Sequence, residues 1–252
     1  MVDRQARRRR RSLVVEAQGG SVTWLGPQNY DNLGVDAAEL IRQAIDQGAD
    51  AIVGPDWVPE AMDPAFEAVV EAGIPLVIYN AGGIEGADRL GAMNYVGAVD
   101  YKAGVAGGAY LGSNGGKNGV CINSLPGAAN IEDYCNGFVE GIESTGGTGS
   151  VLPLPATAQG NVTAVAQAGK EGAVSLCGIN FDEAILTNIN DGKQACAIDQ
   201  QDYQQGYYAV SILNGYVNYG LSIPTREIVT GPGIVDASNI ESTMSGASQG
   251  TR

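Results

Sequence analysis

Short apolar runs alternate along the chain with longer stretches whose apolar residues recur every three or four positions. Short runs bounded by turn residues are typical of buried strands, and the three-to-four spacing is typical of helices. Glycines follow several of the helical stretches, where they can end a helix. The resulting β-α-β rhythm with short loops predicts an α/β fold with parallel sheets and right-handed crossovers. Strands are expected at 22–25, 51–53, 75–79, 95–97, 120–123 and 151–154, and helices at 35–47, 59–72, 100–111, 130–144 and 204–219.

The stretch from Val174 to Tyr207 repeats this pattern and adds polar groups to it. Apolar strands are expected at 174–179 and 195–198, with a helix at 183–189 between them. The first strand is followed by Asn180, Phe181 and Asp182, and the second by Asp199, Gln200 and Gln201. Ligands of open α/β sheets bind outside the carboxyl ends of the strands. The pattern therefore predicts a polar small-molecule cleft, the alternative being polar loop residues that are merely solvated.

Charge is distributed unevenly along the 252 residues, whose formal net charge is −14. Residues 1–12 hold six Arg and one Asp, and we expect them to form a disordered tail. The other 240 residues hold 8 basic and 27 acidic groups. The tail could be a nucleic-acid or nuclear-localisation patch, but we favour a translation-start or gene-model artefact. It does not have the pattern of a signal peptide. The acidic body disfavours nucleic acid and anionic ligands, and it tolerates a neutral or cationic one.

Histidine is absent and cysteine occurs four times. Without His, triads and metal sites that depend on imidazole are excluded. No Cys-x-x-Cys motif is present, which argues against zinc and redox motifs. Proximity along the chain favours the pairs Cys121–Cys135 and Cys177–Cys196, which would indicate an oxidising compartment. Four buried, reduced cysteines are the alternative.

Several segments, in their order and spacing, resemble the type I periplasmic binding proteins, in particular the ribose-like sugar-binding branch. They span residues 24–31, 47–53, 71–80, 94–97, 132–138, 197–207 and 230–233, within a similarity that covers about 14–241. The resemblance implies two α/β lobes that close on a ligand by hinge motion. One lobe would be 13–98 plus 202–229 and the other 99–201 plus 230–241, with 242–252 as a tail.

The resemblance also implies which side chains contact the ligand in a cleft between the lobes. Carboxylates and amides can pair with adjacent hydroxyls, and flat aromatic faces can cover a sugar ring. No catalytic, metal or cofactor role is implied for any residue. The expected ligand-binding residues are Asp56, Trp57, Asn80, Glu132, Phe181, Asp182 and Gln200.

Two departures from the family pattern concern missing strands. Leu13–Gly20 resembles only the end of the family's first helix, so the first strand and most of that helix are lacking. Residues 160–169 run almost directly into Val174, so one strand-helix unit of the second lobe is lacking as well. Losing a strand leaves unpaired sheet edges and uncovered apolar surface.

The leading functional hypothesis is a monomeric solute-binding protein that captures a neutral sugar or polyol for an ABC-type permease or a receptor. By resemblance it would act in the periplasm or outside the cell. The alternatives are the effector domain of a lactose-repressor-like regulator, and a fragmentary remnant that binds nothing. An enzyme using Asp182 and Asp199 as an acid/base pair is conceivable, but we expect no enzyme because the chain has no His, metal motif or nucleophile elbow.

Overall fold

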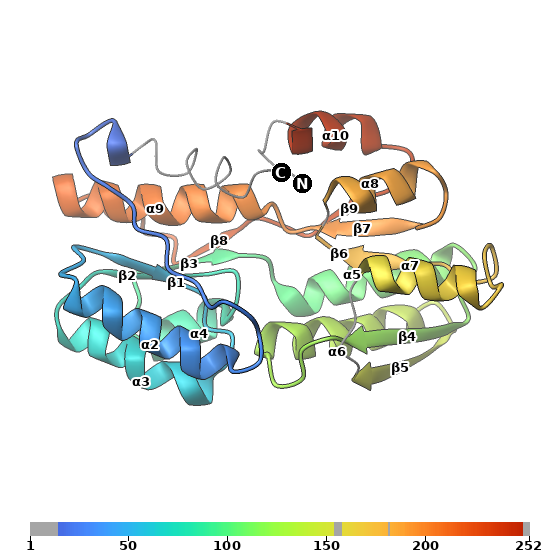
Figure 1. Ribbon diagram of the computed structural model, residues 1–252, viewed down its shortest axis with the longest axis horizontal. Helices are drawn as coiled ribbons and strands as arrows, with labels where there is room; N and C mark the ends of the chain where they lie inside the picture. The colour runs from blue at the N-terminus through green and yellow to red at the C-terminus, as the bar shows by residue number, and fades with distance from the viewer. Residues whose placement is uncertain (1–14, 154–157, 181, 249–252) are drawn as a thin grey trace. The chain divides into compact units, whose positions relative to one another are not determined.

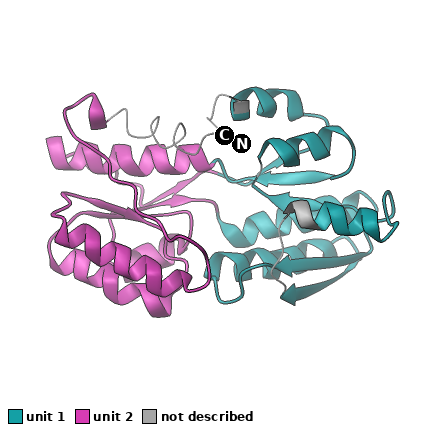
Figure 2. Ribbon diagram, viewed as in Figure 1, with its two compact units in different colours: residues 1–2, 99–201, 231–252 teal, residues 3–98, 202–230 magenta. Residues whose placement is uncertain are grey.

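The computed structural model describes residues 15–153, 158–180 and 182–248 (Figure 1). Within these residues the chain forms two compact units, each built from separate stretches (Figure 2). Unit 2 holds the residues up to Ala98 together with Asp202–Thr230, and unit 1 holds Val99–Gln201 together with the residues from Gly231 onward. None of the described helices is long and apolar enough to cross a membrane. The Arg-rich tail expected at residues 1–12 lies outside the described residues.

Unit 2 contains one parallel sheet whose strands follow the order β1-β2-β3-β8. These strands are Ile52–Gly54, Leu76–Tyr79, Asn94–Gly97 and Glu227–Val229, and the helices are α2 (Leu33–Asp46), α3 (Pro59–Glu71), α4 (Gly83–Arg89) and α9 (Asp202–Tyr219). Successive strand residues face opposite sides of the sheet. Thus Ile78 packs in the cluster that includes α2 and α3, while its neighbour Val77 packs against α9.

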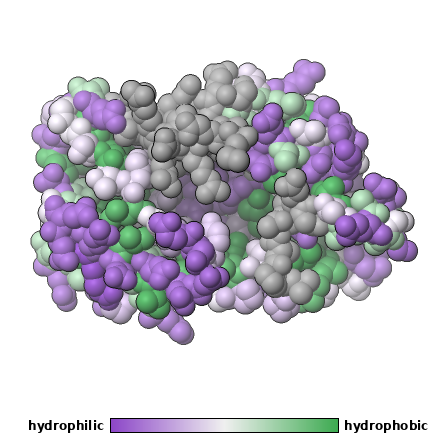
Figure 3. Space-filling view, in the orientation of Figure 1, coloured by the Kyte–Doolittle hydropathy of each residue, from purple (hydrophilic) through white to green (hydrophobic). Residues whose placement is uncertain are grey.

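The outward faces of α2 and α3 carry the polar residues of their amphipathic patterns. Figure 3 shows a mostly hydrophilic surface over these two helices, at the lower left. Met62, Phe66 and Val69 of α3 point the other way and are completely buried. The three-to-four spacing seen in the sequence therefore selects which face of each helix covers the sheet.

The strand expected at Val22–Leu25 does not form. Burial still alternates along these residues, as it would in a strand, but no described strand pairs with them. The edge of β1 away from β2 is likewise unpaired among the described residues. An extended segment becomes a strand only when its backbone groups find partners, so apolar alternation alone was an insufficient signal here.

Unit 1 contains two small sheets. In one, β4 (Asn118–Asn123) runs parallel to β5 (Thr148–Pro153). In the other, β7 (Cys196–Asp199) pairs in parallel with β6 (Cys177–Ile179) and antiparallel with β9 (Gly233–Val235). The helices are α5 (Asp100–Ser113), α6 (Ala129–Glu143), α7 (Ala158–Gln167), α8 (Glu183–Asn190) and α10 (Ile240–Ser248). The predicted α/β class with parallel sheets flanked by helices is confirmed, and β9 is the one antiparallel addition to it among the described strands.

Two parts of unit 1 differ from the sequence-based expectation. Residues 242–248, expected to belong to a tail, continue helix α10, whose Ile240 and Ala247 pack in a cluster with α8 and β7. Residues 158–167, for which no element was predicted, form helix α7, ahead of residues 169–174, where the lacking strand-helix unit was inferred. Strands β4 and β6 each have a partner on one edge only among the described strands, which agrees with a lacking strand.

Both predicted disulfides are present. Cys121–Cys135 joins β4 to α6 with a Cα–Cα distance of 5.3 Å. Cys177–Cys196 joins directly opposed residues of β6 and β7 with a Cα–Cα distance of 4.6 Å. Both distances lie within the range that a disulfide requires. The alternative of four reduced cysteines is excluded in this structure.

Helices α5 and α6 pack at unusually close range because glycines line their contact. A Cβ atom on Gly104 of α5 would lie 2.8 Å from the backbone nitrogen of Phe138 of α6. Reciprocally, a Cβ on Gly137 would lie 3.0 Å from the nitrogen of Val105. Real Cβ atoms do not approach backbone so closely, so the two helices would have to separate to admit even one methyl group.

We therefore expect Gly104→Ala to lower the free energy of unfolding by about 2 kcal/mol. The matched control is Gly215→Ala in α9, where the added Cβ would have its nearest neighbour, the Leu221 Cβ, at 3.8 Å. This second substitution should be neutral or stabilise by about 0.5–1 kcal/mol, since alanine favours helix. Urea denaturation measures both. Equal effects of the two substitutions would contradict the close packing of α5 against α6.

Candidate functional site

Asn80 lies directly after β2 in unit 2 and is held from three sides. Its backbone N–H donates to the Val96 carbonyl at 3.0 Å, and its own carbonyl accepts from the Tyr95 hydroxyl at 2.9 Å. Its side-chain amide donates to Gln205 of α9 at 3.2 Å. The backbone of Asn80 is left-handed, with φ of 65°, a conformation that asparagine tolerates better than most residues. The half-buried side chain is thereby fixed at the carboxyl end of the sheet.

Asp56 and Trp57, which follow β1, take structural positions in unit 2. Asp56 is completely buried and accepts from the Arg89 guanidinium at 2.7 Å, while Arg89 also binds Asp63. Burial, and secondarily the charge of Asp63, raises the pKa of Asp56 to about 6. Trp57 is half-buried against the cluster formed with α2 and α3. Asp56 ties the β1 loop to α4 in this structure, and its expected contact with ligand stays a prediction.

Glu132 connects the end of β4 to the first turn of α6 in unit 1. One of its carboxylate oxygens accepts from the Asn123 amide at 2.8 Å and from the Gly127 N–H at 3.1 Å. Asn123 is the last residue of β4 and is buried. The other carboxylate oxygen takes part in neither bond, so Glu132 can shape the loop and still present an acceptor. Sequence reasoning missed Asn123, although its place at a strand end was a usable signal.

Gln200 and Asn180 follow the neighbouring strands β7 and β6 and bind each other. The Gln200 side-chain amide donates to the Asn180 side-chain oxygen at 3.0 Å, and Gln200 is only 3% exposed. Asn180 and Gln201 are left-handed, with φ of 59° and 57°. Together with Asn80 they are the three non-glycine residues with positive φ in the described chain, and each stands at the carboxyl end of a parallel strand. Such conformations cost energy and gather at functional sites.

Asp182 is exposed and caps the N-terminus of α8. Its side chain accepts from the Ile185 N–H at 2.9 Å, the bond expected of an N-cap aspartate. Asp199, in contrast, is buried and accepts from the Gln201 N–H at 2.8 Å. Phe181, expected beside Asp182, lies outside the described residues. No group of three potential metal ligands occurs among the residues that the structure describes.

The strand ends of each unit thus present amide and carboxylate groups whose positions are fixed by other bonds. An amide both donates and accepts, and a carboxylate accepts at two oxygens, which suits ligands that carry several hydroxyl groups. Within unit 1 these groups are Asn123, Glu132, Asn180, Asp182 and Gln200. Within unit 2 the strand-end group is Asn80, and its hydrogen-bond partner Gln205 lies on α9.

A family model and solved structures match the chain. The model of the periplasmic binding protein domain matches residues 13–154, which is more than half of the chain. The chain belongs to this family of periplasmic binding proteins. No curated protein matches the chain. A family of binding proteins favours solute capture over catalysis, and over both the regulator and the non-binding remnant.

Solved structures of periplasmic binding proteins superpose over almost the whole chain. A carbohydrate transporter from Acidothermus cellulolyticus, in complex with myo-inositol, is 29% identical with a TM-score of 0.81, covering 97% of this chain and 93% of that one. A solute-binding protein from Agrobacterium vitis with D-fucose is 18% identical with a TM-score of 0.80, covering 96% and 94%. One from Burkholderia graminis with D-arabinose is also 18% identical at 0.80, covering 94% and 92%. The last two support the fold alone.

A buried carboxyl group at the start of α5 was not anticipated from the sequence. Asp100 is 7% exposed, and its Oδ1 has no hydrogen-bond partner among the described residues. Burial, and secondarily the nearby Asp133, raises the pKa of Asp100 to about 8, although the hydrogen bond with Tyr134 opposes this rise. Asp100, the first residue of α5 in unit 1, is therefore largely protonated at neutral pH.

This raised pKa predicts a pH-dependent stability. The stabilisation from protonated Asp100 is complete below about pH 4 and is lost as the pH rises through about 8, because ionisation is easier in the unfolded chain. Asp100→Asn, which cannot ionise, should therefore be more stable than the parent at pH 8, by roughly 2–5 kcal/mol, with a gap that closes toward pH 4. Thermal unfolding across this range measures the gap. The exposed substitution Asp31→Asn controls for the loss of one charge, and a gap independent of pH would contradict the prediction.

Proposed function

We propose that this protein binds a neutral sugar or polyol reversibly and delivers it to an ABC-type uptake system. The observation that carries the proposal is the set of fixed amides and carboxylates at the strand ends, centred on the bond between Gln200 and Asn180. The structure in complex with myo-inositol, at 29% identity, is more similar in sequence than those with D-fucose and D-arabinose, at 18% each. We infer that a hydroxyl-rich ring is the ligand class for this chain as well.

The charge of the protein supports a neutral ligand. The formal net charge is −14, and the side chains of the candidate site are amides and carboxylates without a cation among them. The Arg89 guanidinium is already bound to Asp56 and Asp63. Binding a sugar phosphate would bring its charge toward acidic groups without a compensating partner, which costs free energy.

We further propose action in the periplasm or outside the cell, as a monomer, with a membrane permease as partner. The two disulfides support an oxidising compartment. Membership of the periplasmic binding protein family supports the same compartment. We propose no catalytic step and no cofactor.

Two substitutions at Asp182 separate a role in ligand binding from its role as a helix cap. Both Asp and Asn serve as N-caps, so Asp182→Asn should leave stability unchanged, whereas Asp182→Ala should cost about 1 kcal/mol. If the carboxylate accepts hydrogen bonds from ligand hydroxyls, both variants should bind about 10- to 150-fold more weakly, because bonds to charged groups contribute about 1.5–3 kcal/mol. Calorimetric titration with myo-inositol, pentoses and hexoses provides the affinities.

The titrations test the role of Asp182 and the proposed function separately. If a sugar binds equally well to the parent and to Asp182→Asn, Asp182 is only a cap, and Gln200→Ala then becomes the decisive site variant. If no neutral sugar or polyol binds, or if only anionic ligands bind, the proposed function itself is wrong. Recovery of the titrated sugars unchanged would support binding without turnover.

A further inference from the structure

Both disulfides of unit 1 lie close to a hydrogen-bonded pair of candidate-site residues. The first, which we call the β4–α6 bridge, joins Cys121 to Cys135 (Figure 1). Asn123 ends β4 two residues after the first of these cysteines. Glu132 lies in the first turn of α6, three residues before the second. Because the Asn123 amide donates to the Glu132 carboxylate at 2.8 Å, the bridge and this hydrogen bond connect the same strand end to the same helix turn.

The second disulfide, which we call the β6–β7 bridge, lies on the strands that lead to Asn180 and Gln200. It joins Cys177 to Cys196, which oppose each other directly in the parallel ladder. Asn180 follows its cysteine by three residues, and Gln200 follows its cysteine by four. The Gln200 amide donates to the Asn180 side-chain oxygen at 3.0 Å. At about 3.3 Å per strand residue, the bridge is only about 10–13 Å from this pair along the strands.

Few other contacts fix the register of β6 against β7. Their ladder has three residue pairs, and Gly178 at the centre of β6 adds no side chain to the packing. Strand β6 pairs with no described strand other than β7. A slip by one residue would move Asn180 away from Gln200 and turn the side chains of the strand to the opposite face. A covalent bond between opposed residues prevents this slip.

The pair in the β4 region depends in a similar way on how α6 lies against the end of β4. Residues 124–128 connect the two elements without a helix or strand of their own. Within this connection, the Leu125 N–H donates to the Asn123 side-chain oxygen at 3.0 Å, and the Gly127 N–H donates to Glu132 at 3.1 Å. The β4–α6 bridge holds its two Cα atoms 5.3 Å apart, which prevents the helix from sliding along the strand and separating the pair.

We propose that the four cysteines are positioning residues for the ligand site, and that each bridge holds one hydrogen-bonded pair in the geometry that binds hydroxyl groups. This inference rests on the proposed function, since it takes the two pairs to be ligand-binding groups. Polar groups that are fixed before binding lose less conformational freedom when the ligand arrives. Each bridge therefore raises the affinity for ligand through its own pair, in addition to stabilising the fold.

Crossed double-mutant cycles test this proposal, with affinity measured by calorimetric titration of myo-inositol, pentoses and hexoses. Each bridge is removed by alanine substitution of its two cysteines, Cys121→Ala/Cys135→Ala or Cys177→Ala/Cys196→Ala. Loss of the β6–β7 bridge should weaken binding about fivefold or more in the parent and in Glu132→Ala, but by less than about twofold in Gln200→Ala. Loss of the β4–α6 bridge should show the reverse pattern.

Amide hydrogen exchange provides a second measurement that needs no ligand. The Asn180 N–H donates to the Ile198 carbonyl at 2.8 Å, and it should exchange about tenfold faster without the β6–β7 bridge but not without the β4–α6 bridge. The Leu125 N–H, which donates to the Asn123 side chain, should respond to the β4–α6 bridge alone.

Ile142→Ala controls for a general loss of stability. This residue is 1% exposed near the end of α6 that is remote from Glu132, so its truncation should lower the midpoint of thermal unfolding without changing affinity or either exchange rate. Equal losses of affinity in all backgrounds, or the same loss with Ile142→Ala, would overturn the proposal, because the bridges would then act only through stability. If the parent binds no sugar, the proposed function is wrong, and uncrossed exchange rates would overturn the positioning role independently.

Discussion

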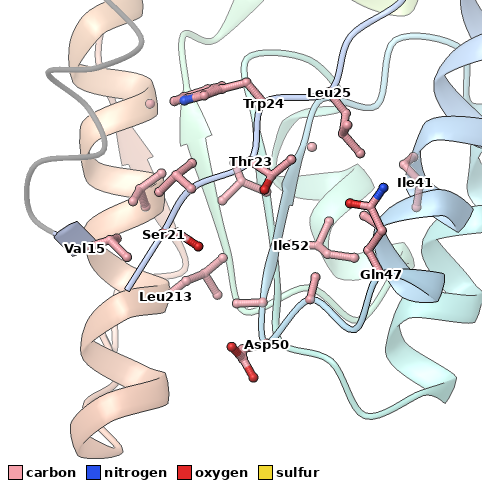
Figure 4. A pocket seen from close by; sticks show the side chains of 18 of the residues that line it. Val15, Ser21, Thr23, Trp24, Leu25, Ile41, Gln47, Asp50, Ile52 and Leu213 are labelled. Carbon is pink, nitrogen blue, oxygen red and sulfur yellow. The ribbon is translucent and has the colours of Figure 1, made fainter. Parts of the chain in front are cut away.

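A parallel strand needs backbone hydrogen bonds on both of its edges and needs its side chains covered on both faces. Most features of this protein follow from which strands have both and which do not. In unit 2, β2 and β3 have both, and their residues Val77, Ile78 and Val96 are completely buried. At β1 the second edge is open among the described strands. Residues 21–25 have the burial pattern of a strand but not the bonds of one, and they line one cavity together with β1 (Figure 4).

The same parallel arrangement creates the candidate site. The carboxyl ends of parallel strands lie at one edge of a sheet, so the residues that follow neighbouring strands lie close together. Asn80 in unit 2, and Asn180 and Gln201 in unit 1, follow their own strands in left-handed conformations, which lets the backbone leave each strand abruptly. Their neighbours are then held by bonds such as that between Gln200 and Asn180. Fixed polar groups pay less of the ordering entropy on binding a ligand than mobile ones would.

The sequence predicted the elements better than it predicted what their side chains do. Apolar periodicity located strands β1 to β7 and the long helices, because burial on defined faces leaves a direct trace in the pattern, but it did not locate β8 or β9. It failed at 22–25, where forming a strand depends on a partner that the pattern cannot reveal. Asp56 illustrates the limit for function, since the sequence places it after β1 but does not show its burial or its ion pair with Arg89. Asp182 likewise has a capping bond that its position alone did not distinguish from a ligand contact.

The two disulfides lie next to strands that have an edge without a paired strand. Both bridges lie in unit 1, and each anchors a strand, β4 or β6, that has an unpaired edge among the described strands. Unit 2 has no bridge among its described residues, but it holds the largest buried apolar cluster, formed with α2, α3 and the sheet. Bridges that span 14 and 19 residues each stabilise by about 3 kcal/mol in the chain-entropy model. Covalent links in unit 1 thus offset the pairing that its two small sheets lack, while unit 2 depends on apolar burial.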